Sequence, residues 1–130
     1  MADPAIVGEW LEKANEDFLF AEANLREGNG FFAQICFHFQ QAAEKYLKAY
    51  IIAKGLRLEK VHDLLHLLRT CMANDTAFSA LQEQCILLNA AYIETRYPVH
   101  WPIDYTREMG EQAHSAAADI AGLVRERIAR

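Results

Sequence analysis

A short segment of the chain combines several side chains that could bind a phosphate or act on one. It reads TRYPVHW over residues 95–101. Arg96 carries the planar guanidinium that grips phosphate, Tyr97 offers a stacking face, and His100 brings an imidazole that titrates near neutral pH. The sequence therefore predicts a ligand-binding or catalytic position here. The alternative is a rigid connector whose aromatic rings pack on the fold.

A second group of candidate residues follows one face of an expected helix. Glutamine, histidine and lysine recur at steps of four and three residues, at Gln34, His38, Gln41, Lys45 and Lys48. A solvated helix face usually carries glutamate–lysine pairs instead. The pattern favours a wall that hydrogen-bonds a ligand, with Gln41 and Lys45 as candidate contacts. A plain solvated face is the alternative.

Histidines spaced for metal binding occur in the string VHDLLH. His62 and His66 are four residues apart and share a helix face, as zinc ligands do in HExxH helices. The string has Asp63 where such helices carry glutamate, and no third ligand is evident. Glu59–His62 and Glu111–His114 each have the Glu-x-x-His spacing of di-iron helical bundles. We expect no metal and no cofactor, and we interpret His62 as a polar ligand contact.

One further pair combines an arginine with a histidine. Arg107 and His114 are seven residues apart, which is two helical turns, so they share one face of the last expected helix. They form an alternative catalytic pair to Arg96 and His100. A coincidence on the helix surface is the other interpretation.

The elements that must position these residues are all expected to be helices. Apolar residues recur with helical spacing over 4–27, 31–54, 61–73, 76–95 and 104–127. Asp3–Pro4 starts the first helix, Gly28 and Gly55 end the first two, and Asp104 caps the last. Because no linker or repeat divides the chain, we predict one domain over 1–130. We expect an all-α, antiparallel four-helix up-down bundle with a short fifth helix.

Composition narrows the classes of function. Apolar residues make up 52% of the 130 residues and charged residues 24%, which excludes intrinsic disorder. The net charge of −5 argues against avid nonspecific binding to nucleic acid, and specific DNA binding is not expected. A local site for a nucleotide or a single RNA strand stays open. The sequence shows no signal peptide and no apolar run long enough for a membrane span, so a cytoplasmic location is expected. Cys36, Cys71 and Cys85 are expected to be free, buried thiols.

Four motifs in order resemble one known family. They are WLEKANEDFLFAEANL at 10–25, FHFQQAAEKYLKAYIIAKG at 37–55, VHDLLHLL at 61–68 and YIETRYP at 92–98. Over about residues 8–125 the chain is similar to the HEPN domain family, in particular to its small stand-alone prokaryotic members. The resemblance implies a bundle of about five helices that forms a homodimer. It also implies nucleotide or RNA binding and partnership with a minimal nucleotidyltransferase, in a toxin–antitoxin-like module.

Many branches of the family cleave RNA without a metal, and the resemblance implies where such chemistry would lie. Their catalytic pattern is an arginine followed, after four to six residues, by a histidine. His would serve as general acid or base and Arg would stabilise the charged phosphorane. Arg107 and His114 have six residues between them, whereas Arg96 and His100 have three.

The leading hypothesis is a HEPN-type helical dimer that binds a nucleotide or RNA and acts with a nucleotidyltransferase. Its ligand contacts would be Arg96, Tyr97, His62, Gln41 and Lys45. Two alternatives stay open. One is an active metal-independent endoribonuclease toxin, and the other is an interaction module that binds no small ligand.

Overall fold

Helices account for all regular structure in the described part of the chain. A computed structural model describes residues 3–94 and 104–130. Its elements are α1 (Pro4–Glu27), α2 (Phe32–Ala53), α3 (Leu64–Asn74), a 3-10 helix η1 (Thr76–Leu81), α4 (Gln82–Glu94) and α5 (Arg107–Ile128). The predicted all-α class is confirmed. No helix within these residues is long and apolar enough to span a membrane.

Local sequence signals fix most helix ends. Asp3 accepts a hydrogen bond from the backbone N–H of Ala5, and Pro4 occupies the first helical position of α1. Gly28 ends α1 with a left-handed φ of 65°, a conformation that a side chain would strain. Gly55, with φ 67°, follows α2 in the same conformation. The predicted first and second helices are therefore confirmed to within about one residue.

Three helix boundaries differ from the sequence-based expectation. α3 begins at Leu64 instead of 61, because Asp63 is extended and its carboxylate caps the N–H of Leu65. The expected helix over 76–95 is divided into η1 and α4, and Asp75 caps η1 through Ala77 N–H. The cap of α5 is Thr106, which accepts from Met109 N–H, and not Asp104. In each case the helix begins after the residue whose side-chain oxygen accepts a hydrogen bond from an otherwise unpaired backbone N–H of the first turn.

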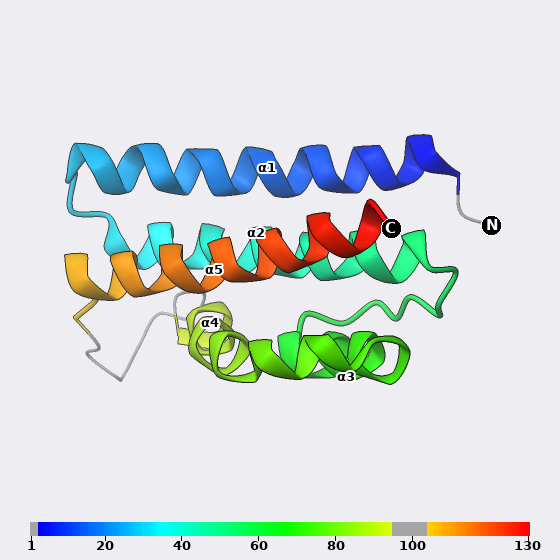
Figure 1. The fold of residues 1–130 in the computed structure, drawn as a ribbon. Coiled ribbons are helices and arrows are strands. Elements are labelled where there is room, and N and C mark those ends of the chain that lie inside the picture. Colours follow the sequence, from blue (N-terminus) through cyan, green and yellow to red (C-terminus); the bar gives the residue numbers. More distant parts are fainter. Residues whose placement is uncertain (1–2, 95–103) are drawn as a thin grey trace.

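The helix α2 lies at the centre of the molecule. It packs against α1, α3, α4 and α5. Figure 1 shows the long helices α1, α2 and α5 side by side, with α1 at one edge and the shorter α3 and α4 on the opposite side. The core along α2 is built from fully buried residues, among them Phe39, Tyr46, Leu47 and Tyr50. One face of α2 is left between α1 and the α3–α4 side, and this face carries the predicted polar stripe.

Candidate functional site

The stripe predicted on 34–48 is divided between two neighbours. On one side, Lys45 and His38 both turn to Asp17 of α1. Lys45 forms an ion pair with the Asp17 carboxylate, and His38 Nδ1 lies 3.5 Å from Asp17 Oδ1. On the other side, Gln41 and Lys48 join groups that face the segment before α3. The candidate contacts Gln41 and Lys45 therefore lie on the same helix but in different clusters.

The second cluster contains a buried ion pair. Glu44 and Lys48 are i,i+4 neighbours on α2, and Lys48 Nζ lies 3.0 Å from Glu44 Oε2. Their side chains are only 6% and 9% exposed. Burying two charges costs desolvation free energy, and their attraction offsets that cost only when further polar groups complete the arrangement. His62 is one such group, because its Nδ1 lies 3.0 and 3.1 Å from the two Glu44 oxygens.

Gln40 completes this arrangement from inside the fold. It is fully buried, and its amide nitrogen lies 3.4 Å from the backbone carbonyl of His62 and 3.5 Å from Glu44 Oε1. Its amide oxygen accepts a hydrogen bond from Gln41 Nε2 at 2.7 Å. Gln40 thereby holds both the backbone and, through Glu44, the imidazole of His62. We call Gln40, Glu44, Lys48, His62 and Tyr92 the His62 cluster.

Tyr92 brings α4 into this cluster. Its ring stacks on the His62 imidazole with centroids 4.9 Å apart and planes 19° apart. Phe37 of α2 also stacks with Tyr92, and their ring centroids are 6.3 Å apart. The His62 side chain is 53% exposed, so one ring nitrogen is held by Glu44 while Nε2 can meet solvent or a ligand. The arrangement is an oriented imidazole beside aromatic rings.

Three predicted site residues lie outside the described part of the chain. They are Arg96, Tyr97 and His100, all within 95–103. Their roles therefore stay predictions. α4, which carries Tyr92 of the His62 cluster, ends at Glu94.

The alternative pair Arg107 and His114 lies along the contact between α5 and α1. Arg107 Nη1 donates to the Leu25 carbonyl at 3.1 Å, and its guanidinium lies over the Phe32 ring, 5.7 Å from the centroid. His114 Nε2 lies 2.7 Å from Glu22 Oε2, and its ring packs against Phe18 and Phe39. Both side chains therefore have structural partners, and they lie away from the His62 cluster.

The histidines noted for metal spacing have carboxylate partners of their own. His66 Nε2 lies 2.8 Å from Glu59 Oε2, so Glu59 pairs with His66 and not with His62. His114 pairs with Glu22 of α1. Among the described residues, no group of three or more His, Cys, Asp or Glu side chains gathers in the way a metal ion requires.

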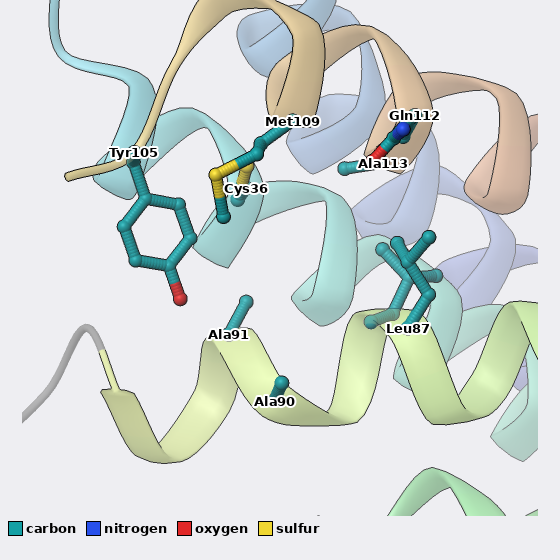
Figure 2. Close-up of a pocket in the computed structure, with 9 residues that line it drawn as sticks. Cys36, Leu87, Ala90, Ala91, Tyr105, Met109, Gln112 and Ala113 are labelled. Carbon is teal, nitrogen blue, oxygen red and sulfur yellow. The ribbon is translucent and has the colours of Figure 1, made fainter. Parts of the chain in front are cut away.

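A small cavity between α2, α4 and α5 offers no alternative site. Figure 2 shows Tyr105 and Met109 reaching toward α4, with Cys36 behind them and Ala90 and Ala91 opposite. The cavity measures about 70 Å³, whereas small-molecule sites run to roughly 300 Å³ or more. Burial raises the pKa of the Cys36 thiol to about 11, so the sulfur is held as an unreactive thiol.

The three cysteines are free and buried, as the sequence predicts. Burial also raises the pKa values of Cys71 and Cys85 to about 12. Sequence reasoning missed three members of the His62 cluster, namely Gln40, Glu44 and Tyr92, and also Phe37, whose ring stacks with Tyr92. Gln40, Glu44 and Lys48 repeat every four residues, and that i,i+4 repeat of polar residues beside an apolar face was the available signal.

Comparisons with known proteins agree on one family. The family model described as the HEPN domain matches residues 7–127. The crystal structure of TT1696 from Thermus thermophilus is 34% identical, covers 92% of this chain and 96% of its own, and superposes with a TM-score of 0.83. ST0689, described as an archaeal HEPN homologue, is 24% identical, with coverage of 94% and 97% and a TM-score of 0.76. No curated protein matches the chain significantly.

Proposed function

The chain belongs to the HEPN domain family, and from that premise we propose that it is a homodimer that binds a nucleotide or a single RNA strand. The binding position is the His62 cluster. The observation that carries this proposal is the half-exposed His62–Tyr92 stack supported by a buried Glu44–Lys48 pair. Family membership further supports a nucleotidyltransferase as the protein partner, in a toxin–antitoxin-like module.

The chemistry of the cluster fits a nucleotide. Stacked rings present a flat face on which a base can lie, and such stacking is tolerant of base identity. Glu44 pairs with His62 Nδ1 and thereby orients the other ring nitrogen, Nε2, toward the ligand. Glu44 itself does not contact the ligand. Preorganisation of this kind is what a binding group needs from its supporting residues. Arg96, Tyr97 and His100, which lie outside the described residues, keep the phosphate and stacking roles that the sequence predicts for them.

The cost of the buried pair also supports a functional role. A pair of apolar residues of similar volume is often as stable as a buried ion pair, or more stable. Glu44 and Lys48 are therefore not explained by stability alone. Their arrangement serves to fix the imidazole at the surface.

Fluorescence anisotropy with labelled single-stranded RNA, with nucleotides as competitors, tests the proposal. His62→Ala and Tyr92→Leu should each weaken binding by about tenfold or more, because base–aromatic stacking contributes ~1–3 kcal/mol per base. His66→Ala is the matched control. It removes a histidine four residues away that pairs with Glu59, and it should leave binding unchanged. Binding that is equally strong in all three variants would place the ligand elsewhere.

An RNA-cleavage assay on the same protein distinguishes a binding function from a catalytic one. EDTA-treated wild type is incubated with mixed RNA beside His100→Ala and His114→Ala. A binding module leaves the RNA intact. Cleavage that disappears in one variant would instead identify a metal-independent endoribonuclease and the histidine responsible. The tagged chain purified from its native host tests the partnership, since a nucleotidyltransferase should copurify with it.

A further inference from the structure

Five aromatic rings form an unbroken row from the His62 cluster to α1. The row begins with the His62–Tyr92 stack and continues through Phe37 of α2, which stacks on Tyr92. The Phe37 ring then contacts the neighbouring His38 ring edge to face, with centroids 5.7 Å apart. His38 contacts Phe20 of α1 in the same manner, with centroids 4.7 Å apart. Each step lies within the range over which aromatic rings attract one another.

The row lies at the surface and not in the core. Its two end residues, His62 and Phe20, are exposed, and the three rings between them are half-buried. Figure 1 shows α1 and the α3–α4 side on opposite sides of α2, and among the described residues α1 packs against neither α3 nor α4. The row therefore crosses the face of α2 that these elements leave open. Rings that served only to join helices would be buried between them, so this exposure points to a role at the surface.

A hollow opens at the α1 end of the row. It measures about 350 Å³, which lies within the size range of small-molecule sites. Two rings stand exposed beside it, with Phe20 52% and Phe31 63% exposed. Among the described residues that line it, none carries a carboxylate, an ammonium or a guanidinium. These lining residues are Phe20, Asn24, Phe31, Gln34, Ile35 and His38.

The chemistry of this lining suits a nucleobase. A base is flat, so it can lie against the ring of Phe20 or Phe31, and its edges carry the donors and acceptors that amide groups pair with. The side chain of Gln34 is exposed at the hollow and can meet such an edge. A phosphate would find no positive partner among the lining residues, so the hollow fits the base of a nucleotide and not its charged part.

The acidic groups close to the row are compensated by lysines of α2. Asp17 Oδ1 lies 3.5 Å from His38 Nδ1, and Asp17 also forms an ion pair with Lys45. Glu44, which lies beside the His62 end of the row, is buried and paired with Lys48. The repulsion that these carboxylates would exert on a phosphate backbone is therefore largely offset.

We propose that the ligand is a single RNA strand of at least two nucleotides, with one base on the His62–Tyr92 stack and another in the hollow beside Phe20 and Phe31. The inference rests on the proposed function and names its substrate class, because a mononucleotide would occupy only one of the two positions. The rings of Phe37 and His38 lie between them and offer intervening bases a surface for stacking.

Fluorescence anisotropy with a short labelled oligoadenylate, and with AMP as unlabelled competitor, tests this assignment. Phe20→Ala and Phe31→Ala should each weaken oligoadenylate binding by about tenfold, because each removes a stacking surface for one base. Leu19→Ala is the matched control. It removes a neighbouring apolar side chain that is 59% exposed and lies outside the hollow, and it should leave binding unchanged. AMP should compete only weakly, because it fills one position.

The outcomes separate this inference from the proposed function. Circular dichroism confirms that each variant is folded. Unchanged oligoadenylate binding in Phe20→Ala and Phe31→Ala, with binding weakened in His62→Ala, would overturn the second base position and leave the His62 position standing. AMP that binds as tightly as oligoadenylate would also overturn it, since one base would then suffice.

Two further outcomes would count against the inference. If the Phe20 and Phe31 variants bind RNA normally but no longer copurify with a nucleotidyltransferase, the hollow docks a protein and not a base. Oligoadenylate binding that is unaffected by His62→Ala, or absent from the wild type, would overturn the proposed function and this inference with it.

Discussion

The supporting residues of the His62 cluster hold the His62 imidazole in position more than they contribute directly to ligand affinity. Glu44 has three partners, namely Lys48, His62 and Gln40, and its carboxylate holds all of them together. Because Lys48 is only 9% exposed, it cannot regain full hydration when Glu44 is lost. The same carboxylate therefore contributes to stability and to the orientation of the ligand-binding imidazole.

Glu44→Ala should lower the free energy of unfolding by about 3 kcal/mol or more, because it leaves a buried ammonium without its counter-charge. The double substitution Glu44→Gln with Lys48→Met removes both charges and should recover most of that loss. Urea unfolding measures both effects. We expect RNA binding to be weaker than in the wild type in Glu44→Ala and also in the double variant, because in both the Nδ1 atom of His62 has lost its carboxylate partner. If binding recovered together with stability, Glu44 would have no positioning role.

At the scale of elements, α3 is anchored through its first residues. The Asp63 carboxylate caps Leu65 N–H and accepts a hydrogen bond from Asn89 Nδ2 at 2.7 Å, while Asn89 Oδ1 accepts from Leu64 N–H at 2.9 Å. The Asn89 hydrogen bond is the main reason that the pKa of Asp63 lies below its ordinary value, with the backbone N–H groups and Arg69 adding to it. This bridge joins α3 to α4 and sets the position of His62 directly before it.

Asp63→Ala should cost about 1 kcal/mol at neutral pH, the usual loss for an N-cap. Because the folded-state pKa is lowered, the charged form contributes stability above the unfolded pKa of about 3.9. That contribution is lost as pH falls through the folded-state value. Thermal unfolding at neutral and strongly acidic pH should therefore show a smaller difference between wild type and Asp63→Ala in acid. If the stability difference between wild type and Asp63→Ala were the same at both pH values, the effect would come from hydrogen-bond geometry and not from the charge of Asp63.

For the whole molecule, the sequence predicts the helical class, the first two helices and the buried thiols, because these depend on apolar periodicity and caps within a few residues. It does not predict which neighbour each polar side chain meets. Lys45 and Lys48 follow the same stripe, yet Lys45 pairs with Asp17 of α1 and Lys48 with Glu44 of its own helix. The sequence also does not predict the N-cap of α5, because Asp104 and Thr106 are both good capping residues. The structure has Thr106 in this position.

The contact between α1 and α5 gives a prediction for the whole fold. Arg107 and His114 tie α5 to α1 through the Leu25 carbonyl and Glu22, and the Arg107 side chain covers Gly28. Arg107→Ala and His114→Ala should therefore each lower the free energy of unfolding, by about 1 kcal/mol, because each removes a side-chain partner that joins α5 to α1.

Neither change touches the His62 cluster, so RNA affinity in the folded variants should match the wild type. Urea unfolding and anisotropy on the same samples measure the two properties. Loss of stability without loss of RNA binding would indicate that the α1–α5 contact has a structural role and that the ligand binds on the α2–α4 side. A loss of RNA binding in well-folded His114→Ala, with His62→Ala unaffected, would move the functional site to α5.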